Sequence, residues 1–257
     1  MNKKYIYLNN YPGGSGLNDV KDRITEFFKV SIILHLIPIL PNVFLSNHHT
    51  RKQKSMLFDY IKIPEFVCKT MPSNTEEIFF WNITTFLPLD NLYLKYKKEI
   101  HELNFNLEFL DKYKQIASEI VNSLDSPLCC LHVRRGDYLN IHNSLHYTTS
   151  PKHIRDVLTK HSDKFTICYI KSNEKKLHFF DELKKDFNIK LFTDFPILKN
   201  IYDSGDNYAL YSIECCIRDL SHIKISTFNT TESEQCWLPN FDKSFFIDYL
   251  DNHKGYQ

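Results

Sequence analysis

The residues best suited to chemistry follow an apolar run in the middle of the chain. In PLCCLHVRRGDYLN, residues 127–140, a stretch of strand character ends in His132, Arg134, Arg135 and Asp137. The planar guanidinium of arginine forms two parallel charge-assisted hydrogen bonds with a phosphate. Two arginines directly after a buried strand therefore indicate phosphate binding, whereas a single one is usually a solvated surface charge or half of a salt bridge.

Two further strand ends carry residues of a similar kind. Lys171-Ser172-Asn173 follows the apolar run FTICYI, and Ser226-Thr227-Phe228 precedes a predicted helix. Small hydroxyl residues before a helix N-terminus suit a phosphate, although alone they are most often only a cap. Ligands of open parallel sheets bind beyond the carboxyl ends of the strands, where these residues lie. Their joint occurrence predicts a site for a diphosphate, and hence for a nucleotide.

Strands and helices alternate along the second half of the chain, and they would place these residues at one sheet edge. Strands are predicted at residues 128–133, 165–170, 189–192 and 222–226, and helices at residues 150–160, 174–187 and 208–220. This alternation is typical of βαβ units and a parallel sheet. The continuous apolar runs indicate strands that are buried on both faces.

The first half of the chain is less regular. A short strand at residues 5–8 leads into NNYPGGSGLND, which holds three of the six glycines, and then into a helix at residues 20–36. Such a turn can bring backbone N–H groups to an anion, but a tight connection also needs glycine for its own geometry. Residues 95–124 predict a long amphipathic helix that is broken near residues 104–106.

Composition narrows the class of protein. The 257 residues, 42% hydrophobic and 25% charged, predict an α/β protein of one large or two small lobes, and the net charge of +1 argues against a nucleic-acid partner.

Seven cysteines without disulfide or zinc spacing predict reduced thiols in a reducing compartment. We find no signal peptide and no apolar stretch of the roughly 20 residues that span a membrane, so we expect a cytoplasmic protein.

Three segments carry a resemblance to a known family. HVRRGDY, residues 132–138, resembles the H-x-R-R-G-D-Y motif of GDP-fucose-dependent fucosyltransferases of the α-1,2, α-1,6 and protein O-fucosyl superfamily. Residues 206–229 are similar to the family segment in which a helix and a strand lead into a Ser-Thr-Phe turn. PGGSGLND, residues 12–19, is similar to the Gly-rich N-terminal loop. The α-1,2 branch is the most similar, and residues 40–120 contribute almost nothing.

The resemblance implies a fold and an activity. The fold would be GT-B, an α/β architecture of two Rossmann-like lobes with parallel sheets. Residues 1–120 would form the N-terminal, acceptor-side lobe, and residues 121–257 the C-terminal lobe that binds the GDP-sugar. The activity would be inverting transfer of L-fucose from GDP-fucose to a sugar hydroxyl of a glycan acceptor, with an α-1,2 linkage expected. No cofactor or metal is expected, because arginines and helix N-termini can neutralise the leaving diphosphate.

The resemblance also assigns roles to single residues. Arg134 or Arg135 would hold the β-phosphate, and Asp137 would order the loop or approach the nucleotide. An inverting transfer normally needs a base for the acceptor hydroxyl proton, unless a phosphate oxygen of the leaving group takes it. The candidates for the base are Asp19, Asp137, His142 and His146. The remaining donor-binding residues would be Gly14, Gly16, Asn18, His132, Ser172, Ser226, Thr227 and Phe228.

The chain departs from the family pattern in three places, one of which is Ser15 of the N-terminal loop, where some protein O-fucosyltransferases carry a catalytic acid. Ser172-Asn173-Glu174 stands where the α-1,2 enzymes usually carry Ser-Asp-Asp, and Asn229 replaces the serine that usually follows the Ser-Thr-Phe turn. Two alternatives therefore stay open. The protein could be a GT-B transferase for another nucleotide sugar, since these residues contact the diphosphate and not the sugar. It could also be a non-catalytic protein of the same fold that binds a glycan or a partner.

Overall fold

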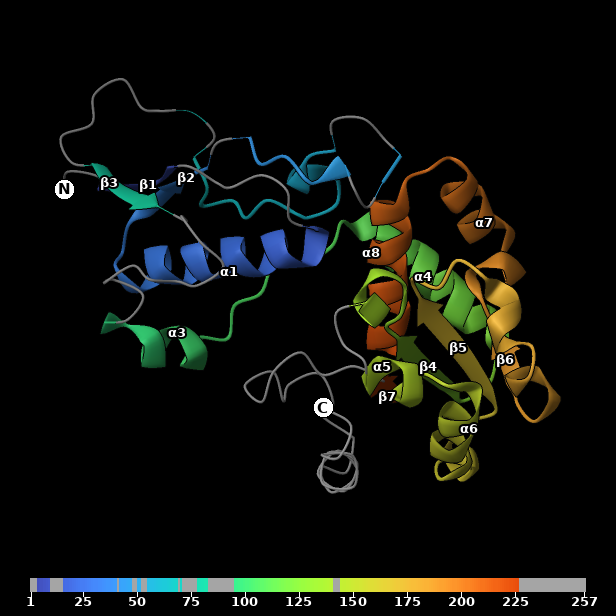
Figure 1. The fold of residues 1–257 in the computed structure, drawn as a ribbon. Coiled ribbons are helices and arrows are strands. Elements are labelled where there is room, and N and C mark those ends of the chain that lie inside the picture. The colour runs from blue at the N-terminus through green and yellow to red at the C-terminus, as the bar shows by residue number, and fades with distance from the viewer. Residues whose placement is uncertain are drawn as a thin grey trace. The chain divides into compact units, whose positions relative to one another are not determined.

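The chain divides into two compact units. The computed structural model describes residues 4–9, 16–40, 42–47, 50–51, 55–68, 70, 78–82, 95–140 and 144–226 (Figure 1). Unit 1 comprises Met1–Tyr113 and Ile201–Ser212, and unit 2 comprises Lys114–Asn200 and Ile213–Gln257. The assignment of residues 1–120 to the acceptor and of residues 121–257 to the GDP-sugar stays a prediction.

Unit 1 contains a parallel sheet of three strands in the order β2-β1-β3. The strands are β1 (Tyr5–Asn9), β2 (Ile37–Ile39) and β3 (Ile78–Asn82), and Figure 1 shows helix α1 (Leu17–Ile33) lying along this sheet. Helix α1 buries its apolar stripe, including Val20, Ile24, Phe27 and Phe28. It ends three residues before the predicted position, because His35 adopts a left-handed backbone conformation with φ of 54° that cannot continue a helix.

A segment from late in the chain completes unit 1. The Tyr60 hydroxyl donates to Asp206 Oδ1 at 2.9 Å, and the Tyr208 hydroxyl donates to the Ser46 carbonyl oxygen at 2.6 Å. The rings of Tyr60 and Tyr208 also pack edge to face, with centroids 5.6 Å apart. These contacts explain why Ile201–Ser212 belongs to unit 1, although more than 80 residues of unit 2 precede it.

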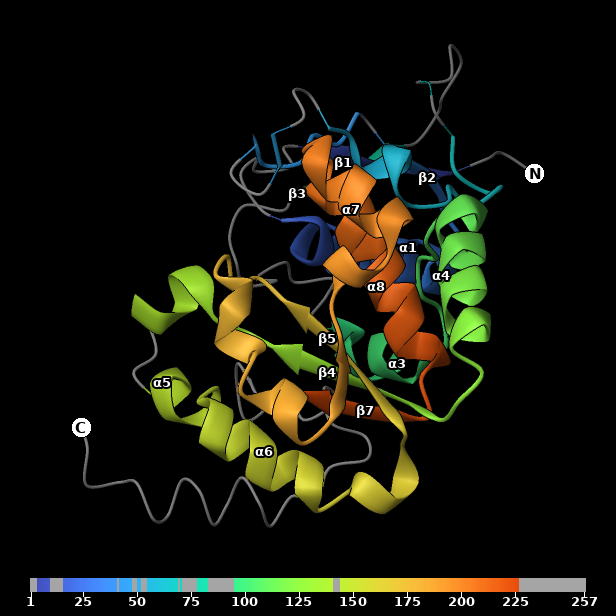
Figure 2. The ribbon, with the colours of Figure 1, turned by 90° about the vertical axis from the view of Figure 1, so that its right-hand side faces the viewer.

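Unit 2 contains the predicted parallel sheet, with four strands in the order β6-β5-β4-β7. The strands are β4 (Leu128–Val133), β5 (Ile167–Ser172), β6 (Asn188–Lys190) and β7 (Ile223–Ser226). Figure 2 shows the sheet between helix α6 (Pro151–Thr159) and helix α8 (Asn207–Leu220). The α6 side forms an apolar core that includes Cys129, Leu131, Val133, Ile154, Leu158, Cys168, Ile170, Phe180 and Leu183.

The remaining elements are short, apart from one helix. They are η2 (Leu57–Asp59), α3 (Lys97–Glu102), α4 (Asp111–Leu124), η3 (Gly136–Asn140), α5 (Ser144–Thr148), η4 (Ser162–Lys164), η5 (Leu177–Phe180), η6 (Leu183–Lys185), η7 (Phe192–Asp194) and α7 (Pro196–Asp203). The gap between α3 and α4 confirms the predicted break near residues 104–106. Helix α6 begins as predicted, with Ser150 Oγ accepting from the His153 amide and Pro151 in the first turn.

The predicted helix at residues 174–187 is wrong, because two short 3-10 helices, η5 and η6, occupy this segment. The reason lies at its start, where the Glu174 carboxylate accepts hydrogen bonds from the Lys176 amide and from Arg135. These bonds hold an irregular turn where the helix would have begun. The two short helices still carry Phe180 and Leu183 into the core, so the apolar periodicity was a correct sign of burial.

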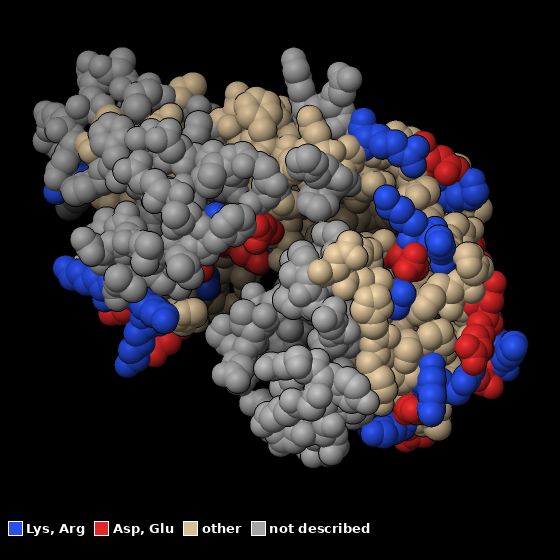
Figure 3. All heavy atoms as spheres, viewed as in Figure 1, with Lys and Arg blue, Asp and Glu red and all other residues tan. Residues whose placement is uncertain are grey.

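The surface of unit 2 carries both signs of charge. Figure 3 shows Lys and Arg intermixed with Asp and Glu on its visible face. One exposed cluster joins Arg155 to Glu182 at 3.0 Å and to Asp186 at 2.6 Å. Among the described residues, no helix is both long and apolar enough to cross a bilayer.

Candidate functional site

The carboxyl ends of three parallel strands place a row of polar side chains across the sheet of unit 2. The register pairs His132 of β4 with Lys171 of β5 on one side and with Ser226 of β7 on the other. Paired residues of neighbouring strands project from the same face, so these three side chains lie on one face of the sheet. That face is the α8 side, because Lys171 Nζ donates to Sγ of Cys215 on α8 at 2.9 Å.

His132 and Ser226 form the centre of this row. Nδ1 of His132 and Oγ of Ser226 are 3.2 Å apart and share a hydrogen bond. Burial, and then the positive charges of Lys171, Arg218 and Arg134, hold the pKa of His132 well below its ordinary value. The imidazole is therefore neutral near pH 7, and it lies between the Ser226 hydroxyl and the positively charged Lys171.

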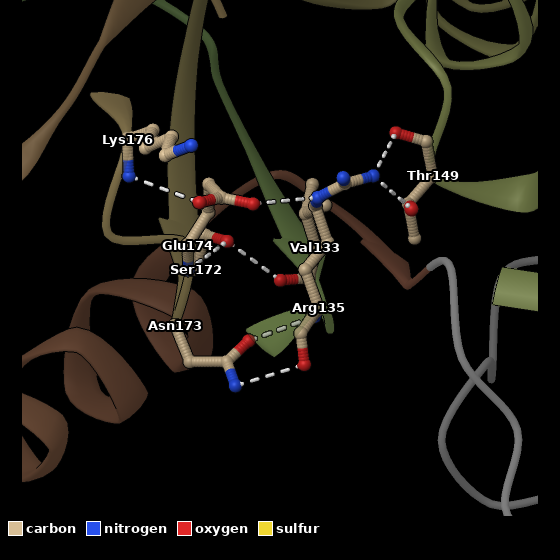
Figure 4. Close-up of polar contacts among 7 residues, drawn as sticks. All are labelled: Val133, Arg135, Thr149, Ser172, Asn173, Glu174 and Lys176. Atoms are coloured by element: carbon tan, nitrogen blue, oxygen red, sulfur yellow. Dashed lines mark hydrogen bonds and ion pairs between the residues drawn. The ribbon is translucent and has the colours of Figure 1, made fainter. Parts of the chain in front are cut away.

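Polar contacts and ring stacking hold the side chain of Arg135 (Figure 4). Its Nε donates to Glu174 Oε2 at 2.8 Å, and its Nη1 donates to Thr149 Oγ1 at 2.7 Å and to the Thr149 carbonyl oxygen at 3.3 Å. The guanidinium also stacks on the ring of Phe179, with 3.9 Å between Cζ and the ring centroid. The side chains of Arg135 and Glu174 are only 12% and 14% exposed, so this is a largely buried ion pair.

The end of β5 holds the backbone around the two arginines. Ser172 Oγ donates to the Val133 carbonyl oxygen at 2.8 Å. Asn173 Oδ1 accepts from the Arg135 amide at 2.7 Å, and Asn173 Nδ2 donates to the Arg135 carbonyl oxygen at 3.0 Å (Figure 4). The backbone is thus fixed at the residue before Arg134 and at the residue after it.

Glu174 completes this arrangement. Burial raises the pKa of the Glu174 carboxyl, but hydrogen bonds from the Lys176 amide and from Arg135, together with the charge of Arg135, outweigh burial and lower the pKa below its ordinary value. The carboxylate is therefore ionised near pH 7. The segment Ser172-Asn173-Glu174, which departs from the usual Ser-Asp-Asp, forms a connected set of contacts with the HVRRGD turn.

Gly136 is required where it stands. Its φ is +60°, and a Cβ there would lie 2.6 Å from Asn173 Nδ2. We expect Gly136→Ala to lower the free energy of unfolding by about 1–3 kcal/mol, since it adds left-handed strain and displaces an amide that binds Arg135. Urea denaturation of purified protein measures this loss.

Gly205→Ala provides a matched control for the Gly136 variant. Gly205 has φ of +83°, and its added Cβ would lie 2.7 Å from Arg51 Cβ, but it belongs to unit 1. Both variants should lose stability, and only Gly136→Ala should also displace the Asn173 amide from the backbone of Arg135. A Gly136→Ala protein as stable as wild type would contradict the role given to this turn.

The other predicted residues of unit 2 are placed as follows. Asp137 lies in η3, where only its backbone is described, and His146 lies exposed on α5. His142, Thr227 and Phe228 lie outside the described residues.

The predicted N-terminal loop belongs to unit 1. Gly16 is the N-cap residue of α1, and Asn18 Nδ2 donates to Asp22 Oδ2 at 3.0 Å. Asp19 Oδ2 lies 3.9 Å from a guanidinium nitrogen of Arg23. Gly14 lies outside the described residues, and the roles of all these residues stay predictions.

Sequence reasoning missed a buried polar cluster on the α8 side of the sheet. The Tyr169 hydroxyl donates to Glu214 Oε1 at 2.9 Å, and both residues are buried. Burial raises the pKa of Glu214 to about 7, although the charge of Lys171 and the hydrogen bond from Tyr169 oppose the shift. A signal was present, because Glu214 lies on the same helical stripe as the apolar Leu210 and Ile217.

Within the described ranges, no three of the His, Cys, Asp and Glu side chains are grouped so that they could hold a metal ion. The six described cysteines are free thiols, as the sequence predicts, and Cys236 lies outside the described residues.

The fold is similar to that of solved glycosyltransferases. The selenomethionine structure of fucosyltransferase NodZ from Bradyrhizobium has a TM-score of 0.53 and 10% identity, covering 94% of this chain and 96% of that chain. NodZ α-1,6-fucosyltransferase co-crystallized with GDP has a TM-score of 0.52 and 9% identity, covering 89% and 90%. No model of a known family matches the sequence, and no curated protein is similar to it. At this identity the likeness establishes the fold, and it confirms the predicted GT-B class.

Proposed function

We propose that this protein is a fucosyltransferase that uses GDP-fucose and a glycan acceptor. The observation that carries the proposal is the end of β4, where a doubled arginine, a neutral histidine and a buried serine meet at the ligand-binding edge of a parallel sheet. The structure of NodZ, which has the same fold over almost its whole length, was solved with GDP and after soaking with GDP-fucose. Both findings support a GDP-sugar donor.

The two arginines have separate roles in this proposal. The guanidinium of Arg135 is held by Glu174 and Thr149 on the α6 side. Arg134 is half-buried, and its charge acts on His132 on the opposite, α8 side, which also carries Ser226. Arg134 is therefore the residue that we assign to the β-phosphate of the donor, where its charge would stabilise the departing diphosphate.

The finer features follow from the sequence resemblance and stay proposals. Transfer would be inverting and would need no metal, since Arg134 and backbone N–H groups supply positive charge to the leaving group. The acceptor proton would go to Asp137, His142 or His146, or to a phosphate oxygen of the leaving GDP. We propose an α-1,2 linkage on the strength of the HVRRGDY and Ser-Thr-Phe segments, while NodZ is an α-1,6 enzyme.

Donor selectivity provides the first test. At a concentration 100 times the Kd, a ligand stabilises the folded state by about 2.7 kcal/mol, so GDP-fucose should raise the Tm by roughly 5 °C or more. UDP-sugars should not change the Tm. The difference between the Tm shifts with GDP-fucose and with GDP-mannose measures how much the fucosyl group contributes to binding. A shift with a UDP-sugar alone would indicate a transferase for another donor.

Turnover provides the second test. Protein, GDP-fucose and a panel of oligosaccharides should release GDP in proportion to fucosylated product, and product analysis would distinguish α-1,2 from α-1,6 linkages. Binding of GDP-fucose without turnover on any acceptor would favour the non-catalytic alternative.

A further inference from the structure

We propose that Glu174 is a positioning residue, which fixes Arg134 for the donor phosphate by holding Arg135. This inference rests on the proposed function, because it concerns the same phosphate site. It assigns a role to one of the two positions, Asn173 and Glu174, at which the chain departs from the Ser-Asp-Asp pattern.

The first step is the ion pair itself. Arg135 Nε and Glu174 Oε2 are 2.8 Å apart, both side chains are more than four-fifths buried, and Phe179 covers the guanidinium plane. Removing one partner of a buried pair leaves the other charge without compensation, which is far costlier than the loss of a surface pair. The position of Arg135 is therefore tightly coupled to the carboxylate of Glu174.

The second step is the fixed position of Glu174. Its other carboxylate oxygen, Oε1, accepts from the Lys176 amide at 2.9 Å, and its own amide donates to Ser172 Oγ at 3.1 Å. The carboxylate is therefore anchored at the start of the β5–η5 connection and does not follow Arg135 if the turn after β4 shifts. Contacts other than the one with Arg135 therefore set the position of Glu174, and Glu174 in turn holds Arg135.

The third step is the backbone between the two arginines. The Val133 carbonyl is held by Ser172, and the Arg135 amide and carbonyl are held by Asn173. Along the chain, Arg134 is the one residue between these two attachments. A shift of Arg135 would pull on the peptide bond that joins it to Arg134, so the ion pair between Arg135 and Glu174 would control the position of Arg134.

Glu174→Gln tests the proposal by phosphate discrimination. GMP lacks the β-phosphate, so the ratio of the Kd for GMP to the Kd for GDP reports the β-phosphate contact and cancels any general loss of folded protein. We expect this ratio to fall on the order of tenfold in Glu174→Gln, the size of one lost charge-assisted hydrogen bond, with a lower kcat for GDP-fucose. Glu174→Asp should recover part of the ratio.

Glu182→Gln is the matched control. It removes the partner of an arginine in the same unit, but its pair with Arg155 is exposed. This variant should keep the wild-type Kd ratio and kcat. Thr149→Ala is the second variant, because it removes the other side-chain contact of Arg135 without leaving a charge uncompensated, and it should lower the ratio by a smaller factor.

The outcomes separate this inference from the proposed function. If wild type binds neither GDP nor GDP-fucose, the proposed function fails and this inference fails with it. If wild type binds GDP and Glu174→Gln keeps the wild-type ratio, only the inference is overturned. A Glu174→Gln protein that loses GMP and GDP affinity equally has a structural defect alone, and this also overturns it. If Glu174→Gln does not fold, a wild-type ratio in Thr149→Ala decides against the inference.

Discussion

Arg134→Ala is expected to lower kcat for transfer from GDP-fucose by at least about 100-fold, the loss typical when one preorganised donor to a developing oxyanion is removed. In the proposed reaction, negative charge on the leaving diphosphate grows as the bond to fucose breaks, and the positive charge of Arg134 acts on His132, which is hydrogen-bonded to Ser226. Steady-state kinetics with saturating donor and acceptor measure this loss. Arg134→Lys should retain only part of the activity, since lysine keeps the charge but not the planar fork.

Arg135→Ala is the contrasting variant. It leaves the Glu174 carboxylate largely buried without its partner, which typically costs about 3–5 kcal/mol of stability. We therefore expect a large fall in the urea midpoint for Arg135→Ala and a much smaller fall for Arg134→Ala. If Arg134→Ala keeps full turnover, or if Arg135→Ala is as stable as wild type and inactive, the roles assigned to the two arginines are wrong.

The sequence could not have separated these two arginines. They are adjacent, and their difference depends on Thr149 and Glu174, which are 14 and 39 residues away. Periodicity and apolar runs could predict strand β4, which precedes the two arginines, and its place in a parallel sheet. A strand that is buried on both faces has a continuous run of apolar residues. The partners of a polar side chain leave no such signature.

The errors in the predicted fold have the same cause, because the partners of polar side chains cannot be predicted from the sequence pattern. Residues 174–187 have the apolar spacing of a helix, yet the carboxylate of Glu174 accepts a hydrogen bond from Arg135, which follows strand β4, and the chain turns instead. The association of Ile201–Ser212 with unit 1 depends on Tyr60 and Asp206, which are 146 residues apart. Local patterns predict elements well when their cause is local, and they fail where a distant polar contact decides.

Glu214→Gln is expected to make the protein about 3 kcal/mol more stable at pH 8 while leaving its stability near pH 4.5 almost unchanged. In the folded protein, burial raises the pKa of Glu214 from 4.5 to about 7, and one pKa unit corresponds to about 1.4 kcal/mol. The side chain is only 6% exposed, so solvent screening does not reduce this value much. Glutamine keeps an oxygen that can accept from the Tyr169 hydroxyl.

The sign follows from the two states. Below pH 4.5 the carboxyl is protonated in both the folded and the unfolded chain, so it contributes no pH dependence. Between pH 4.5 and about 7 the unfolded chain releases the proton and the folded protein retains it, so stability falls as the pH rises. Above about pH 7 both states are ionised, and the loss is complete.

The titration of His132 changes stability with pH in the opposite direction to that of Glu214. The unfolding free energies of wild type and Glu214→Gln must therefore be compared at each pH. The folded pKa of His132 is lowered, so its stabilising contribution is present above its unfolded pKa of about 6.5 and is lost as the pH falls. In wild type the two effects partly cancel between pH 4.5 and 6.5. The difference in unfolding free energy between Glu214→Gln and wild type removes the His132 contribution and isolates Glu214.

Urea denaturation at half-unit steps from pH 4.5 to 8.5 gives this difference. It should be near zero at the acid end, rise through the range of the shifted pKa and level off above pH 7.5. Glu119→Gln, the same change at an exposed position of α4, is the matched control. If the Glu214→Gln difference does not change with pH, or if the variant is less stable than wild type at pH 8, then Glu214 is ionised in the folded protein and the nearby charge of Lys171 outweighs burial.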